Sequence, residues 1–137
     1  MPRLMAFDYG LKRIGIAVSD PLQIIASGLT TVATTEIWTF IQKYLQQEAV
    51  ETFVLGYPLN LNNTPAEIAE EVERFFEQLQ KLYPQIPVYR IDERFTSKIA
   101  AQTLAMSGLK KQKRQNKALL DEVSATIILQ SFMDMKK

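Results

Sequence analysis

The sequence predicts an α/β protein in which helices flank a central five-stranded mixed sheet. Three observations support this prediction. Residues 3–32 contain three short apolar runs joined by short links, which is typical of an antiparallel meander. From residue 37 onward, apolar residues recur at intervals of three and four, the period of a helix. These helical stretches alternate with two more apolar strands, which favours right-handed crossovers between parallel strands. The 137 residues fit one domain, residues 1–137.

The meander is predicted from its apolar runs and its turns. Residues 3–8 form the first strand, which ends in a turn at Tyr9-Gly10. The short loop Leu11–Arg13 leads into a second strand at residues 14–19, so the two strands form a hairpin. Residues 28–32 are a weaker third strand.

The rest of the chain alternates between helix and strand. A first helix is opened by Thr34 or Thr35, and its apolar face consists of Ile37, Phe40, Ile41, Tyr44 and Leu45. Residues 52–56 form a short strand buried on both faces.

Three further helices and one strand complete the order. Thr64–Glu67 is a capping box that starts the second helix, and Pro84 and Pro87 end it. Residues 88–91 form the fifth strand. Ser97 caps a helix that runs to Ser107-Gly108, and the last helix spans residues 120–133.

The composition excludes several kinds of active site. The chain contains no histidine and no cysteine. Ser–His and Cys–His nucleophile pairs, imidazole acid–base catalysis and zinc clusters of these residues are therefore ruled out. Carboxylates remain, and they are the preferred ligands of hard cations such as Mg²⁺ and Mn²⁺. We expect any chemistry performed by acids in this chain to be metal-assisted.

Apolar runs and cysteine content bear on the compartment. No uncharged apolar run reaches the roughly 18 residues that a membrane span needs. The N-terminus meets Asp8 too early for a signal peptide. The lack of cysteine suits a reducing compartment. We expect a cytoplasmic protein with no membrane association.

Acidic side chains stand at three of the predicted elements. Asp8 ends the first strand, Asp92 and Glu93 follow the fifth strand, and Asp121 lies at the start of the last helix. If the first, fourth and fifth strands are parallel, their carboxyl ends open onto one sheet edge, where α/β proteins bind ligands. The four acids are therefore candidate catalytic residues.

Each acid also has a structural explanation. Asp8 could open an Asx-type turn, and Asp121 could cap the last helix. Asp92 and Glu93 could be a solvated strand end, with Arg94 neutralising one of them. Small residues at 124 and 125, one turn after Asp121, argue for a site, because they let that helix face approach the sheet closely.

Basic and polar residues near the same strand ends are candidate contacts to a nucleic-acid backbone. The net charge is only +1, so such contacts depend on local clusters of charge. Tyr9, Tyr57 and Phe95 could stack on bases, although packing is the commoner use of such rings. The candidate nucleic-acid-binding residues are Lys12, Arg13, Asn60, Arg94, Lys110, Lys111, Lys113, Arg114 and Lys117.

Four segments in order resemble the YqgF/RuvX family, the Holliday-junction-resolvase-like proteins of the RNase H-like superfamily. They are Phe7–Gly10 with Lys12 and Ile14-Gly15, then Leu55–Asn60, then Asp92–Arg94 with Thr96-Ser97, and finally Asp121 with Ser124-Ala125 and Ile127–Ser131. Together they cover nearly the whole chain.

The resemblance implies an RNase H-like fold and a metal-dependent nuclease that matures the 5′ end of precursor 16S ribosomal RNA in the cytoplasm. It assigns Asp8 to the strand-one acid, Glu93 or Asp92 to the acid of the Asp-Glu-Arg motif, and Asp121 to the last-helix acid. We predict that Asp8, Glu93 and Asp121 ligate one or two Mg²⁺ or Mn²⁺ ions. Asp92 is predicted either to support these ligands without contacting the metal or to serve as an alternate ligand.

Other functions are kept as alternatives. The chain could be a Holliday junction resolvase-like DNA endonuclease that acts on branched DNA. It could also be a non-catalytic ribosome maturation factor that binds nucleic acid. An aspartate-turn-glycine hairpin after strand one occurs in actin-like ATP-binding proteins too, but this chain is too short for their second subdomain. Both a monomer and a homodimer fit the sequence.

Overall fold

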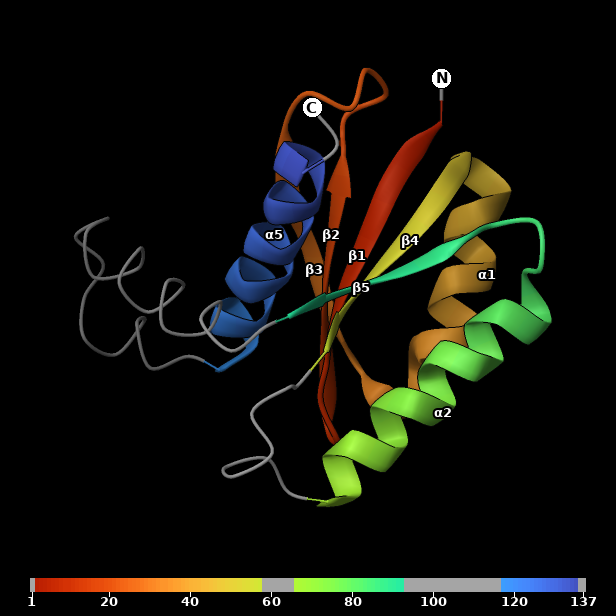
Figure 1. Cartoon of the computed structure of the whole chain (residues 1–137), viewed down its shortest axis with the longest axis vertical. Helices are drawn as coiled ribbons and strands as arrows, with labels where there is room; N and C mark the ends of the chain where they lie inside the picture. The colour runs from red at the N-terminus through yellow and green to blue at the C-terminus, as the bar shows by residue number, and fades with distance from the viewer. Residues whose placement is uncertain (1, 58–65, 93–116, 136–137) are drawn as a thin grey trace.

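The computed structural model describes residues 2–57, 66–92 and 117–135, with the backbone alone for residues 57, 66–67, 92 and 117–121. Five strands, three α-helices and one 3-10 turn make up this part of the chain (Figure 1). In order they are β1 (Arg3–Tyr9), β2 (Arg13–Ser19), β3 (Ala26–Ala33), the 3-10 turn η1 (Thr34–Glu36), α1 (Ile37–Gln47), β4 (Val50–Tyr57), α2 (Ala66–Leu82), β5 (Val88–Asp92) and α5 (Lys117–Met135).

The five strands form one mixed sheet in the order β3-β2-β1-β4-β5. β1, β2 and β3 are antiparallel neighbours, whereas β4 is parallel to β1 and β5 is parallel to β4. The predicted fold class is therefore confirmed, including the directions of all five strands. Because these three strands are parallel neighbours, the carboxyl ends of β1, β4 and β5 lie at the same end of the sheet; those of β1 and β4 point downward in Figure 1.

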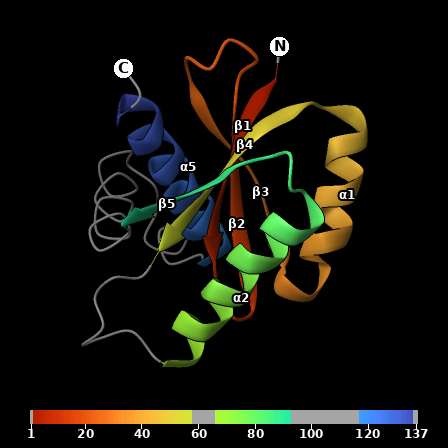
Figure 2. The same ribbon diagram turned by 45° about the vertical axis from the view of Figure 1, so that its right-hand side comes forward.

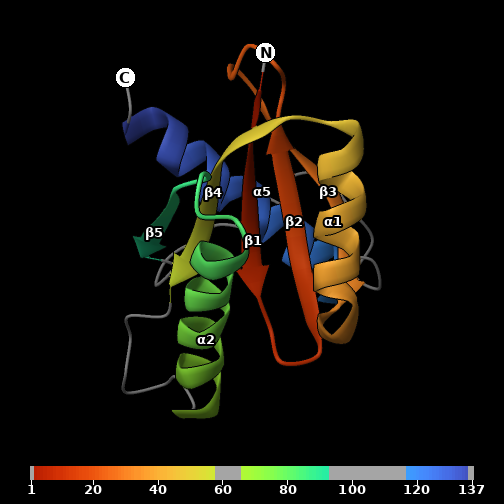
Figure 3. The same ribbon diagram turned by 90° about the vertical axis from the view of Figure 1, so that its right-hand side faces the viewer.

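Helices cover both faces of the sheet. Figures 2 and 3 show α1 and α2 on one face and α5 on the other. Alternation along β1 separates the two cores, because successive residues of a strand point to opposite faces. Met5 and Phe7 pack toward α1 and α2. Leu4 and Ala6 pack toward α5.

Aromatic rings build much of the core under α2. The Phe7 ring lies 5.7 Å from that of Phe53 and 5.4 Å from that of Phe75, measured between centroids. Phe7 and Phe53 are fully buried. Burying such a side chain contributes roughly 1.5–3 kcal/mol, so this cluster anchors β1 and β4 beneath α2.

Small residues let α5 lie close to the sheet. Ala6 and Ala17 of the sheet and Ala125 of α5 are fully buried in the core between them. On β3, a Cβ at Gly28 would come within 3.2 Å of Glu122 Oε1 and 3.3 Å of Thr126 Oγ1. The close approach predicted from the small residues at 124 and 125 is therefore confirmed.

Two predictions about helix starts are wrong. Neither Thr34 nor Thr35 caps α1, which follows the turn η1 and has Glu36 at its N-cap position without a side-chain cap bond. The Thr34 hydroxyl instead donates to the Gly10 carbonyl oxygen at 2.7 Å, which ties the start of α1 to the β1–β2 turn. α5 begins at Lys117 and not at residue 120.

Some predicted elements lie outside the described residues. They are the capping box at Thr64-Pro65 and the helix from Ser97 to Ser107-Gly108.

Candidate active site

Asp8 lies inside β1 and not in a turn. It pairs with Gly15 of β2, and Tyr9 after it pairs with Ile14, so both residues belong to the ladder. The Asx-turn explanation of Asp8 is therefore wrong. Asp8 shares its phase with Leu4 and Ala6, which face α5. The partly buried Asp8 carboxylate thus stands on the α5 face of the sheet, and its partner across the ladder, Gly15, has no side chain.

β5 ends at the same level of the sheet as Asp8. The parallel register places Phe7 beside Leu55 on β4, and Gly56 beside Ile91 on β5. Asp8 is thus level with the end of β5, two strands away. Two inter-strand spacings correspond to roughly 10 Å between main chains. Asp92 is the last residue of β5, and Glu93 lies outside the described residues.

The described residues of β5 show which of its positions face α5. Ile91 belongs to the core under α5, and the Tyr89 ring lies 5.3 Å from that of Phe132 on α5. Arg90 points the other way: its guanidinium lies 4.0 Å from the Phe76 ring centroid on α2. Positions 89 and 91 therefore face α5, and position 90 faces α2.

Asp121 is the fifth residue of α5. An N-cap stands before the first helical residue, so the helix-cap explanation of Asp121 is wrong. Ser124 and Ala125, three and four residues further on, are 2% and 0% exposed. Residues at these spacings share a helix face, so position 121 lies on the face of α5 that meets the sheet. The N-terminal end of α5 lies at the same end of the sheet as the carboxyl ends of β1 and β4 (Figure 1).

Three of the predicted nucleic-acid contacts fall on described positions. Lys12 is exposed in the β1–β2 turn, Arg13 is the partly buried first residue of β2, and Lys117 is the first residue of α5. The others lie outside the described residues: Asn60, Arg94, Lys110, Lys111, Lys113 and Arg114.

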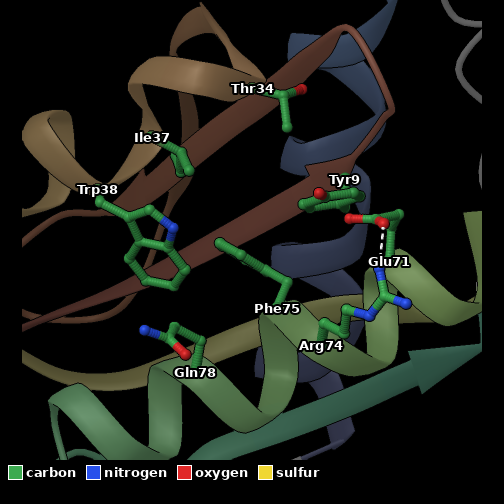
Figure 4. A pocket seen from close by; sticks show the side chains of 8 residues that line it. All are labelled: Tyr9, Thr34, Ile37, Trp38, Glu71, Arg74, Phe75 and Gln78. Atoms are coloured by element: carbon green, nitrogen blue, oxygen red, sulfur yellow. Dashed lines mark hydrogen bonds and ion pairs between the residues drawn. The ribbon is translucent and has the colours of Figure 1, made fainter.

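A pocket of about 210 Å³ opens on the opposite face of the sheet from Asp8 (Figure 4). Tyr9, Trp38 and Phe75 supply its aromatic walls, and Glu71, Arg74 and Gln78 of α2 supply polar groups. Burial raises the pKa of the Tyr9 phenol, and so do the charge of Glu71 and a hydrogen bond to it. Tyr9 therefore stays protonated at neutral pH.

Sequence reasoning noticed Tyr9 but missed the rest of this pocket. Trp38 packs against the core from α1 and Gln78 is a polar residue of α2, and both line the pocket only because α1 and α2 lie on the same face of the sheet. The sequence carried no signal for their meeting.

No cluster of three potential metal ligands occurs among the residues whose side chains are described. Of the predicted ligands, Asp8 is the member whose side chain belongs to that set. Within the same part of the chain, no helix is long and apolar enough to cross a membrane.

Comparison with known proteins identifies the family. The model of the family described as "RuvX: Holliday junction resolvase" matches residues 2–135. This chain belongs to the RuvX family. Curated RuvX relatives named "Putative pre-16S rRNA nuclease" match over the full length. The protein of Bacteroides fragilis is 53% identical, covering 100% of this chain and 99% of its own. That of Amoebophilus asiaticus is 51% identical, covering 100% and 97%.

Solved structures show the same fold for this RuvX protein. Thermus thermophilus RuvC in complex with a Holliday junction substrate matches with a TM-score of 0.60 and 16% identity, covering 99% of this chain and 96% of RuvC. Fowlpox virus resolvase in complex with Holliday junction DNA matches with a TM-score of 0.59 and 12% identity, covering 98% of each chain. The RNase H-like fold is thereby established.

Proposed function

We propose that this RuvX family protein is a metal-dependent nuclease that matures the 5′ end of precursor 16S ribosomal RNA in the cytoplasm. The observation that carries the proposal is the position of Asp8. It stands in the last part of β1, level with the end of β5, on the face that α5 covers. The names of relatives above 50% identity support the choice of substrate.

We assign Asp8, Glu93 and Asp121 as the acids of the site. The Asp-Glu-Arg segment, part of the resemblance to the RuvX family, supplies the second acid: we assign Glu93 as the partner of Asp8, with Asp92 in a supporting role.

The donor set fits a hard divalent cation. Oxygen ligands without histidine or cysteine suit Mg²⁺ or Mn²⁺. When bound, such an ion would activate the attacking water and stabilise the leaving oxygen.

The other residues of the proposed site bind and position the strand. Lys12, exposed in the turn that follows Asp8 and Tyr9, is available to a phosphate of the substrate. We assign the same role to the basic residues between Lys110 and Lys117 and to Arg13, Asn60 and Arg94. These contacts hold the backbone in register and carry little sequence information.

Cleavage of branched DNA is the second candidate. The description of the family model as a Holliday junction resolvase favours it. A third is a ribosome maturation factor that binds RNA without cutting it. Such a factor would bind precursor RNA with a steep salt dependence and no metal-dependent turnover.

The test is cleavage of labelled precursor 16S RNA, with branched DNA in parallel, in the presence of Mn²⁺. The wild-type chain is expected to cut the RNA. Asp8→Asn is expected to lower the rate by about two orders of magnitude or more, since metal-ion catalysis supplies several kcal/mol of transition-state stabilisation. Asp134→Asn is the matched control, because Asp134 lies near the other end of α5.

Three results would contradict the proposal. One is the absence of cleavage by the wild-type chain. Another is an unchanged rate in Asp8→Asn. The third is exclusive cleavage of the branched DNA, which would establish the second candidate.

A further inference from the structure

The pocket that contains Tyr9 is built around three aromatic rings. The Phe75 ring lies 5.0 Å from the Tyr9 ring and 5.1 Å from the Trp38 ring, with interplanar angles of 42° and 40°. Phe75 is buried and forms the floor, while Tyr9 and Trp38 stand partly exposed on either side (Figure 4). We call this site, with Glu71, Arg74 and Gln78 on its rim, the aromatic pocket.

The rim offers directional hydrogen-bonding groups. The Trp38 indole N–H and the Gln78 amide have no hydrogen-bond partner among the described residues, and both line the pocket. Glu71 accepts a hydrogen bond from Arg74 at 2.6 Å and also interacts with the Tyr9 hydroxyl. Donors and acceptors therefore surround a flat apolar floor.

Charge and size restrict what fits. The Arg74 guanidinium is already paired with Glu71, and an anionic phosphate would meet that carboxylate. The volume of about 210 Å³ is below the roughly 300–1,000 Å³ of sites for drug-sized ligands. A single flat heteroaromatic ring matches these limits better than a whole nucleotide.

The pocket also lies at the same end of β1 as the proposed catalytic acid, on the other face of the sheet. Asp8 and Tyr9 are consecutive residues of β1 whose side chains point to opposite faces of the sheet. A nucleic-acid strand that passes over the end of β1 can thus place a phosphate beside Asp8 and turn a neighbouring base toward Tyr9 and Trp38.

We propose that the aromatic pocket binds one unpaired nucleobase of the substrate strand, next to the phosphate that is cut. This inference rests on the proposed function, since it assigns the pocket to the same substrate. Stacking on Tyr9 and Trp38 holds the base, and Gln78 together with the indole N–H contacts its edge. The protein then requires an unpaired nucleotide at the cleavage position.

The tryptophan content makes binding directly measurable. Trp38 is the one tryptophan of the chain, so intrinsic tryptophan emission comes from the pocket wall. The experiment titrates the full-length protein, without divalent metal, with a short single-stranded oligoribonucleotide and with the same strand annealed to its complement. We expect the single strand to quench Trp38, and the duplex to bind without quenching.

Substitutions locate the effect, with binding read from the anisotropy of labelled RNA. Trp38→Leu is expected to weaken single-strand binding by about 5- to 150-fold, the range spanned by base–aromatic stacking. Gln78→Ala is expected to weaken it by roughly 2- to 12-fold, as for one lost hydrogen bond. Gln80→Ala is the matched control: Gln80 is an exposed glutamine on the same helix and does not line the pocket.

The inference is overturned if the single strand leaves Trp38 emission unchanged or if the duplex quenches it equally. Binding by Gln78→Ala and Trp38→Leu equal to that of Gln80→Ala would overturn it as well. These outcomes are independent of cleavage. If the protein cuts RNA but shows no quenching, the proposed nuclease function stands and the base-binding role of the aromatic pocket is rejected. A protein that is quenched but does not cut retains the pocket as a binding site.

Discussion

Gly10 joins the strand that carries Asp8 and Tyr9 to the β1–β2 turn. A Cβ at this position would lie 2.5 Å from the carbonyl oxygen of Arg13. That contact is with backbone, so it cannot be relieved by rotating a side chain. In the same turn, the Gly10 carbonyl oxygen accepts a hydrogen bond from the Thr34 hydroxyl. One residue thus holds the end of β1 against β2 and the start of α1.

We predict that Gly10→Ala lowers the free energy of unfolding by roughly 1–3 kcal/mol, the usual cost of a steric overlap that the backbone must relieve. Gly28→Ala is the control. Its new Cβ would meet the side-chain oxygens of Glu122 and Thr126 at 3.2 and 3.3 Å, and side chains can move. Urea unfolding of both variants tests this, and a larger loss in Gly28→Ala would contradict it.

Asp20 orders the loop between β2 and β3. Its carboxylate accepts hydrogen bonds from the backbone N–H groups of Ile25 at 2.8 Å, Ile24 at 2.7 Å and Leu22 at 3.2 Å. These bonds hold the pKa of Asp20 below its usual value, and the bond from Ile25 makes the largest contribution. They favour the charged carboxylate in the folded protein.

The lowered pKa of Asp20 predicts a pH dependence. Stabilisation by these bonds is fully present above the unfolded-state pKa and is lost as the pH falls through the lower, folded-state pKa. Amide resonances of Ile24 and Ile25 are expected to follow this titration in NMR spectra, with a midpoint below the ordinary aspartate value. A midpoint above that value, or the same titration in Asp20→Asn, would contradict the assignment.

At the scale of elements, α5 lies against the sheet through its smallest side chains. Ser124 and Ala125 are buried where the helix crosses strands that carry Ala6 and Ala17. The bulky residues Ile128, Leu129 and Phe132 follow along the same face. The backbone of α5 is therefore held close to the sheet one turn after position 121.

We predict that Ala125→Leu lowers the free energy of unfolding by about 1–3 kcal/mol, since a leucine has no room at a fully buried position. It should also reduce RNA cleavage by more than its effect on folding, because pushing α5 outward moves position 121 away from Asp8. Val123→Leu, on the partly exposed flank of the helix, should change neither the free energy of unfolding nor the rate of RNA cleavage. Full cleavage by folded Ala125→Leu would contradict this role of the helix.

At the scale of the whole molecule, net charge does not draw the protein to a polyanion. Sixteen basic and fifteen acidic residues leave a charge of +1. Attraction to nucleic acid must come from where cations are placed. Lys12 is exposed in the turn beyond Asp8 and Tyr9, and it lies at the end of the sheet assigned to the active site.

Lys12→Ala is expected to weaken RNA binding about equally for all sequences. It should lower the salt slope, the change of log binding constant with log salt concentration, by about 1, as for the loss of one phosphate contact. Lys81→Ala, an exposed lysine in the last turn of α2, should leave the slope unchanged. Binding measured at several salt concentrations tests both variants, and equal slopes would remove Lys12 from the interface.

Local sequence patterns were sufficient to predict the architecture of the sheet and its helices. Apolar alternation and helical spacing report which face of each element is buried, so the five strands, the three described α-helices and the strand directions could all be inferred. Asp8, Asp92, Glu93 and Asp121 stood out as candidate site acids, because each lies at or just after an apolar run; their role stays a prediction.

Only the packed structure decided how these residues are placed. The ladder put Asp8 inside β1, and the length of α5 moved Asp121 away from the helix cap. The aromatic pocket exists because α1 and α2 lie on the same face of the sheet, where Trp38 of α1 meets Phe75 of α2. Periodicity records burial within one element. It cannot record which residues of two elements meet, since that depends on long-range packing of the whole sheet and its helices.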